Sequence, residues 1–178
     1  RIVWYKNDGA ADPTFSIHLI NDDVGGPTKI FASDLDGDND IDVVFNATDA
    51  NEIDWLENNG SESFTEHYVS YSWNRPTFVY GDDIDSDGDT DIIAGDRTKV
   101  KWSKNDGSGK FTEYTIHTST DAPQYGGPGF NDGHIADIDN DGDMDVLTSS
   151  QNGENGGLLW YKNNGSESFT THIINSNY

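Results

Sequence analysis

The sequence predicts an all-β protein built from repeated units of four short strands. Two signatures, an aspartate-rich loop and a tryptophan hairpin, recur at intervals of about fifty residues, which is typical of solenoids, propellers and arrays. The runs between them are rich in β-branched and aromatic residues with strand-like alternation, and no segment shows helical periodicity. Four short strands per repeat favour a β-propeller, in which each repeat forms one antiparallel blade.

The first complete repeat shows how the strands are expected to fall. Ile53 and Trp55 lie two residues apart and therefore share one face of a strand. The Asn-Asn-Gly-Ser sequence at 58–61 consists of residues that favour a turn, and it separates this strand from the next. We expect the four strands of this repeat at 28–33, 41–46, 52–57 and 64–70.

Turn-forming segments divide the chain into blades. Gly25-Gly26-Pro27, Asn74-Arg75-Pro76 and Gly126-Gly127-Pro128 mark the blade entries. We expect a single repeat domain, 1–178, with a half blade of two strands at 1–24 and blades at 25–73, 74–122 and 123–178. Because propellers usually close with four to eight blades, about three and a half blades predict a partial propeller. It is either a fragment of a longer propeller or part of an oligomeric ring.

Each aspartate-rich loop places a carboxylate at positions 1, 3, 5, 7 and 9. Charges packed so closely repel one another unless a cation lies among them. Ca²⁺ accepts six to eight oxygen ligands, whereas Mg²⁺ prefers a smaller octahedron and keeps its waters. We therefore expect about three Ca²⁺ ions, one per loop, bound by side chains at positions 1, 3, 5 and 9 and the backbone carbonyl at position 7. The predicted metal residues are Asp34, Asp36, Asp38, Asp40 and Asp42; Asp83, Asp85, Asp87, Asp89 and Asp91; and Asp137, Asp139, Asp141, Asp143 and Asp145.

Two other interpretations of these loops are disfavoured. An EF-hand needs a glutamate at position 12 and flanking helices, but here strand-like runs follow and position 12 is Phe45, Ala94 or Thr148. A solvated acidic face would explain the charge but not three loops with the same spacing.

Position 6 of each loop is expected to be a sharp bend with positive φ. Gly88 and Gly142 suit such a bend, and the first loop has Asn39 there instead. On this basis the first loop is expected to bind its cation more weakly than the other two.

The aromatic residues fall into two groups. Trp4, Trp55, Trp102 and Trp160 recur in the hairpins and are expected to pack between blades rather than to stack on carbohydrate. His18, His67 and His172 recur in register, where the remaining repeat has Tyr114, which favours packing over catalysis, and His134 occupies an aromatic position shared with Phe31 and Tyr80. The residues outside the repeat pattern are candidates for an exposed aromatic platform: Trp73, Tyr71, Tyr125 and Phe130.

These motifs resemble the FG-GAP/VCBS repeat family, which occurs in integrin α-subunit heads and in secreted bacterial proteins. The resemblance is carried by the three DxDxDxxxD loops, the strand that follows each loop, such as 91–95, and the W-x-x-N-x-G hairpins. It implies a calcium-binding β-propeller with Ca²⁺ between the first and second strands of each blade. It also implies that the ions are mainly structural and that the protein works in adhesion or ligand binding.

Composition narrows the functional classes. The formal net charge of −23 disfavours nucleic acids and anionic membrane surfaces as partners. No apolar run reaches the length of roughly 20 residues that spans a membrane, so membrane insertion is not expected. Weak to moderate calcium sites are filled at extracellular calcium concentrations, which predicts a secreted or cell-surface protein.

The sequence carries no recognisable catalytic signature, since it has no cysteine, no G-x-S-x-G and no H-E-x-x-H. We therefore expect a binding or adhesion module rather than an enzyme, with a protein or glycan ligand and a possible homo-oligomer that completes the ring. One alternative is the propeller portion or accessory domain of a polysaccharide-degrading enzyme. Another is a structural spacer in a large surface protein.

Overall fold

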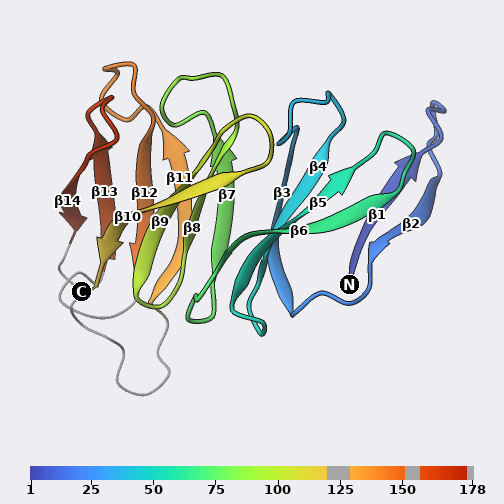
Figure 1. The fold of residues 1–178 in the computed structure, drawn as a ribbon, viewed down its shortest axis with the longest axis horizontal. Helices are drawn as coiled ribbons and strands as arrows, with labels where there is room; N and C mark the ends of the chain where they lie inside the picture. The colour runs from blue at the N-terminus through green and yellow to red at the C-terminus, as the bar shows by residue number, and fades with distance from the viewer. Residues whose placement is uncertain (120–128, 151–156, 176–178) are drawn as a thin grey trace.

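The computed structural model describes residues 1–119, 129–150 and 157–175, and every regular element within these ranges is a β-strand (Figure 1). The strands form one two-stranded and three four-stranded sheets. Within the described ranges no helix is long and apolar enough to span a membrane. The all-β fold predicted from the sequence is therefore confirmed.

Each sheet is an antiparallel meander whose strands follow one another in chain order. The first sheet pairs β1 (Ile2–Asn7) with β2 (Phe15–Asn21). The second contains β3 (Pro27–Ser33), β4 (Asp42–Ala47), β5 (Glu52–Asn58) and β6 (Phe64–Tyr71). The third contains β7 (Phe78–Asp82), β8 (Asp91–Gly95), β9 (Lys99–Asn105) and β10 (Phe111–Thr118). The fourth contains β11 (Phe130–Ala136), β12 (Asp145–Ser150), β13 (Gly157–Asn163) and β14 (Phe169–Asn175).

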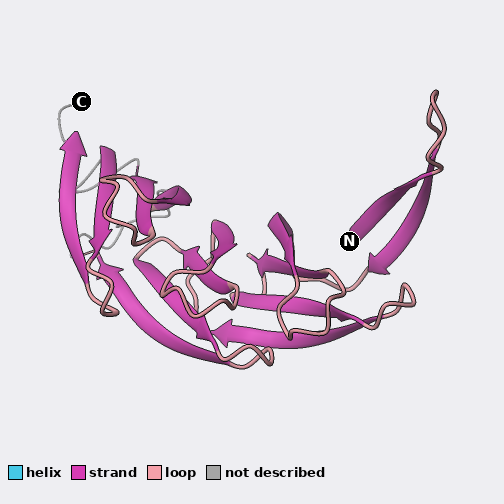
Figure 2. Ribbon diagram, turned by 90° about the horizontal axis from the view of Figure 1, so that it is seen from above, coloured by secondary structure: helices cyan, strands magenta, loops and turns pink. Residues whose placement is uncertain are grey.

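The sheets stand in sequence along an open arc, with the first and the fourth sheet at its opposite ends (Figure 2). Four-stranded antiparallel sheets in such a fan are the blades of a partial β-propeller. Gly126, Gly127 and Pro128, the expected entry to the last blade, lie outside the described residues.

A separate apolar core fills the space between each pair of neighbouring sheets. Phe45 and Leu56 pack with Ile2 between the first two sheets. Ile53 and Trp55 of the same second sheet contribute to the next core, which contains Val44, Val79 and Ile92. The third core joins the last two sheets through Phe78, Ile93, Trp102, Val146, Leu159 and Tyr161. Because strand side chains alternate between faces, each inner sheet contributes to two cores.

Two of the four repeated tryptophans, Trp55 and Trp102, pack in the cores between blades, as predicted. The side chains of Trp55 and Trp102 are only 3% and 0% exposed. Each repeated tryptophan lies opposite an aromatic ring on the adjacent strand: Trp4 with His18, Trp55 with His67, Trp102 with Tyr114 and Trp160 with His172, at centroid separations of 4.6, 4.8, 5.0 and 4.8 Å. His134 makes an edge-on contact with Tyr80 across the interface between the third and fourth sheets.

Two of the four residues predicted to form an exposed aromatic platform are buried, so the prediction is wrong for them. Trp73 is buried, donates its indole N–H to Ser70 Oγ at 2.5 Å, and has the Lys101 ammonium 4.4 Å from its ring centroid. Phe130 is also buried, and its ring packs edge-on against that of His117, with 5.7 Å between the ring centroids. Both side chains contribute to the cores between blades, although they lie outside the repeat pattern. Tyr71 is 67% exposed, as expected, and Tyr125 lies outside the described residues.

One charged residue of the second sheet is buried without compensation. Asp54, in β5, is only 2% exposed, and its Oδ1 has no hydrogen-bond partner. Burial, together with the charges of Glu52 and Glu66, raises the pKa of the Asp54 carboxyl to about 7. Below about pH 7 the folded protein therefore favours the protonated, neutral form of this side chain.

Replacing Asp54 with asparagine should stabilise the protein in a pH-dependent way. The folded-state pKa lies above the unfolded value of 3.8, so ionisation destabilises the fold progressively as pH rises from 4 to 7. Asp54→Asn should increase the free energy of unfolding at pH 8 by up to about 4 kcal/mol, with a smaller gain at pH 5. Chemical denaturation at both pH values measures this, with Asp12→Asn on an exposed loop as the control. An equal gain at pH 5 and pH 8 would contradict the assignment.

Candidate metal centres

Each aspartate loop lies between the first and second strands of a four-stranded sheet. The loops join β3 to β4, β7 to β8 and β11 to β12. The last aspartate of each loop is also the first residue of the following strand: Asp42, Asp91 and Asp145. Position 9 is therefore anchored in the sheet, whereas positions 1 to 8 form the loop itself.

The structure brings three carboxylates together in every loop. In each group the potential ligand oxygens lie within 4.8 Å of one another: Asp34, Asp36 and Asp42; Asp83, Asp85 and Asp87; and Asp137, Asp139 and Asp145. Positions 1 and 3 belong to all three groups, joined by position 9 in the first and third loops and by position 5 in the second. Position 7 belongs to none of the groups. Position 5 is also absent from the groups of the first and third loops, and position 9 is absent from the group of the second loop.

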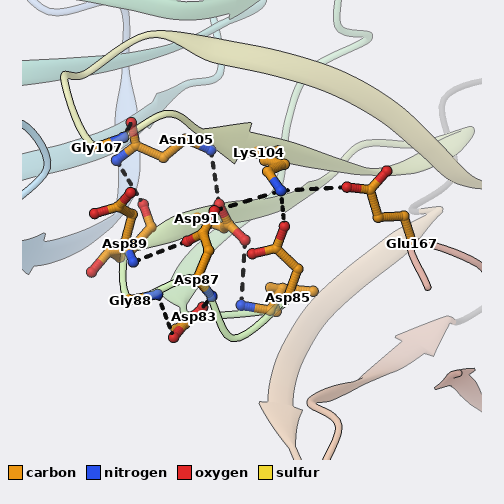
Figure 3. A network of polar contacts seen from close by, with 12 residues as sticks. Asp83, Asp85, Asp87, Gly88, Asp89, Asp91, Lys104, Asn105, Gly107 and Glu167 are labelled. Atoms are coloured by element: carbon orange, nitrogen blue, oxygen red, sulfur yellow. Dashed lines mark hydrogen bonds and ion pairs between the residues drawn. The ribbon is translucent and has the colours of Figure 1, made fainter. Parts of the chain in front are cut away.

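The side chains at position 7 lie against the adjacent hairpin. A Cβ atom at Gly60, Gly107 or Gly165 would come within 2.6 Å of the carboxylate of Asp40, Asp89 or Asp143, respectively. Figure 3 shows this arrangement for Asp89 and Gly107. Glycine suits the positive φ of this hairpin position, and a larger residue there would displace the carboxylate at position 7.

Backbone N–H groups within each loop hold the aspartates at positions 1 and 5. In the second loop, Asp83 accepts hydrogen bonds from the N–H groups of Asp87 and Gly88, both at 3.0 Å, and Asp87 accepts one from Asp89 N–H at 3.1 Å (Figure 3). The third loop repeats these bonds, with Asp137 accepting from Asp141 and Gly142. The loop geometry is therefore built by the same residues that are predicted to bind the metal.

The predicted bend at position 6 is confirmed. The φ angles are +71° at Asn39, +98° at Gly88 and +96° at Gly142. Position 4 also has positive φ, which the sequence analysis missed, at Gly37, Ser86 and Asn140. Asparagine and glycine tolerate this conformation better than most residues, but Ser86 gives no comparable sequence signal.

The aspartate at position 9 connects the loop to the sheet. Asp91 is completely buried and accepts hydrogen bonds from Asn105 N–H at 2.8 Å and Ile84 N–H at 3.3 Å. Asp42 is held in the same way by Asn58 and Leu35. Despite these bonds, burial raises the pKa of Asp91 to about 7 and that of Asp42 to about 6. A neighbouring cation would favour the ionised form of both carboxyls.

The donor set suits a hard divalent cation. All the clustered ligands are carboxylate oxygens, which favour Ca²⁺, Mg²⁺ or Mn²⁺ over softer metals. In the second loop, Asp85 Oδ1 is buried and has no hydrogen-bond partner. An unsatisfied anionic oxygen facing other carboxylates is the group that a bound cation would satisfy.

Asparagines of the tryptophan hairpins connect neighbouring blades. Asn105 Nδ2 donates to Thr90 O in the aspartate loop of its own blade at 3.1 Å and to Leu35 O in the aspartate loop of the preceding blade at 2.7 Å. Asn163 Nδ2 repeats the arrangement with Met144 O and Ile84 O, each at 3.1 Å. From the sequence, these asparagines were predicted only to be turn residues. Their recurrence three residues after each tryptophan was the available signal.

The structure also adds two lysines to the loops. The Lys104 ammonium contacts Asp85 and lies 3.5 Å from Asp87 and 3.3 Å from Glu167 of the next hairpin (Figure 3). Lys162 makes the corresponding contacts with Asp139 and, at 3.0 Å, Asp141. These contacts were not predicted from the sequence, because the lysines lie in another strand, separated along the chain from the loops.

Substitution of Asn105 by alanine should test the connection between blades. The change leaves the carbonyls of Leu35 and Thr90 without this donor, so we expect a loss of about 3 kcal/mol in the free energy of unfolding. Asn7→Ala is the matched control, because Asn7 is exposed and its side chain accepts a turn bond from Gly9 N–H. Denaturant unfolding measures both. Equal, small losses in the two variants would contradict a role for Asn105 between blades.

Comparisons with known proteins agree with this architecture. Residues 83–148 match the FG-GAP-like repeat family. The search of curated proteins found no significant match. Among solved structures, one match is a lectin from Agrocybe aegerita, described as specifically recognising non-reducing terminal N-acetylglucosamine.

The match to the lectin is one of fold. It has a TM-score of 0.65 and 19% sequence identity, and it covers 97% of this chain and 46% of the lectin chain. The chain thus spans less than half the length of that protein. The family match, in contrast, includes both the second and the third aspartate loop. Residues 83–148 of this chain are therefore similar to the FG-GAP-like repeat, as the aspartate loops predict.

Proposed function

We propose that the chain is a calcium-stabilised β-propeller segment of an extracellular protein that binds a glycan or protein ligand. The observation that carries this proposal is the clustering of three carboxylates at the same place in each four-stranded blade. In this reading Ca²⁺ is structural: it offsets the repulsion among the aspartates and so fixes the connection between the first two strands. No catalytic role is assigned to the chain.

An extracellular setting fits the charge of the protein and the nature of its sites. Exposed loops rich in carboxylates, with a formal net charge of −23 for the whole chain, are favoured where calcium is present at millimolar concentration. At cytosolic calcium levels, sites of weak to moderate affinity would be empty and the carboxylates would repel one another.

Calcium should raise the thermal stability of the protein, and chelation should lower it. A site that binds only the folded state contributes about 2.7 kcal/mol when free calcium is 100 times the dissociation constant. For a chain of this size, each occupied site should raise the melting temperature by about 5–10 °C. Calorimetry in calcium and in EDTA measures the effect. The triple variant Asp36→Asn, Asp85→Asn, Asp139→Asn should lose it, and an unchanged melting temperature in EDTA would refute the calcium role.

A hollow between the second and third sheets is the best candidate for the ligand site. It has a volume of about 570 Å³, within the range of small-molecule sites. It is lined by residues of β6, β10 and the hairpin before β10: His67, Tyr68, Val69, Ser70, Tyr71, Gly109, Phe111 and Glu113. Two exposed tyrosines offer rings for the apolar faces of a sugar, and a carboxylate held by Lys101 offers acceptors for its hydroxyl groups.

A glycan array performed in calcium tests this part of the proposal. Because the matched lectin is described as recognising non-reducing terminal N-acetylglucosamine, glycans with that terminus are the first to examine. Tyr71→Ala should reduce the affinity for a bound glycan about tenfold by removing the exposed ring. Tyr5→Ala is the control, since Tyr5 is similarly exposed but lies on the first sheet. Equal binding by the two variants would place the ligand elsewhere, and hydrolysis of a glycan would favour an enzyme.

A further inference from the structure

The three aspartate loops differ in the sign of one neighbouring charge. The residue that directly precedes the hairpin asparagine is Glu57 in the second sheet, Lys104 in the third and Lys162 in the fourth. These positions are equivalent, because the three residues pair with Thr65, Thr112 and Thr170 at the same place in their sheets. A difference in charge among these three residues therefore acts from the same position relative to each aspartate loop.

In the second and third loops the neighbouring charge is positive, and the ammonium group that carries it contacts predicted metal ligands. Lys104 contacts Asp85 at position 3 and lies 3.5 Å from Asp87 at position 5. Lys162 contacts Asp139 and lies 3.0 Å from Asp141, which occupy the same positions. A cation that binds these loops must compete with an ammonium group already held by two of the carboxylates.

In the first loop the neighbouring charge is negative. The Glu57 carboxylate lies 2.6 Å from His67 Nε2. Its place in the sheet is the one from which Lys104 and Lys162 reach the aspartate loops of their own sheets. Glu57 thus increases the negative potential at the carboxylates of the first loop, where its lysine counterparts decrease it.

We propose that this residue sets the calcium affinity of each blade, and that the first loop is the high-affinity site. The inference rests on the proposed calcium function and assigns an order to its three sites. Reversing a unit charge a few ångströms from a bound divalent ion changes affinity by about tenfold or more, even with strong solvent screening. This order is the reverse of that expected from Asn39 at the bend. The φ of Asn39 matches the bend of the other loops in sign, so its identity imposes no evident geometric defect.

Calorimetric titration of the intact chain with Ca²⁺ tests this order. The wild-type protein should show one tight site and two sites at least about tenfold weaker. Glu57→Gln keeps a hydrogen-bonding partner for His67 but removes the charge, and Glu57→Lys supplies the residue found in the other blades. Both should weaken the tight site, and Asp36→Asn should remove it. Lys104→Glu should convert one weak site into a tight one.

Charge-matched controls separate a local effect from a change in net charge. Asp22→Lys changes the net charge as Glu57→Lys does, and Lys110→Glu matches Lys104→Glu, both at exposed positions. These controls should leave the order of the sites unchanged. Three equal sites in the wild-type protein, or equal effects of test and control variants, would overturn the proposed order while leaving calcium binding intact. A wild-type protein that binds no calcium would refute the proposed function and this inference together.

Discussion

The structure depends on how each blade accommodates a buried aspartate at the start of its second strand. Asp42, Asp91 and Asp145 are fully buried, and each accepts one N–H from its own loop and one from the hairpin between the third and fourth strands. One carboxylate therefore fixes the loop, the hairpin and the sheet relative to one another. Its charge is costly in this environment unless a cation lies beside it.

The same hairpins carry the contacts that order one blade against the next. The N–H groups of Asn105 and Asn163 hold the buried aspartate of their own blade, while their side-chain amides bond to the loop of the preceding blade. Three residues earlier, Trp102 lies in the core between the last two sheets, where Phe169 of the fourth sheet packs edge-on against it. Apolar packing and polar contacts between blades thus occur side by side, and one asparagine contacts the aspartate loops of two neighbouring blades.

Much of this arrangement follows from the sequence because the repeats are regular. The repeat period and the alternation at Ile53 and Trp55 predict the strands, and the bends at Gly88 and Gly142 follow from the conformational needs of a short loop. Contacts that join segments distant in the chain could not be read in this way. The Lys104 contact with Asp85 and the burial of Trp73 both depend on how neighbouring strands pack, which no local pattern records.

Direct observation of the ions in a crystal grown at millimolar calcium would test the central claim, that the aspartate loops exist to hold cations. The account predicts anomalous density in all three loops, surrounded by carboxylate oxygens at about 2.3–2.6 Å. It also predicts that the ammonium groups of Lys104 and Lys162 move away from Asp85 and Asp139. Loops that contain no ion at saturating calcium, with both lysines still seated on these aspartates, would contradict it.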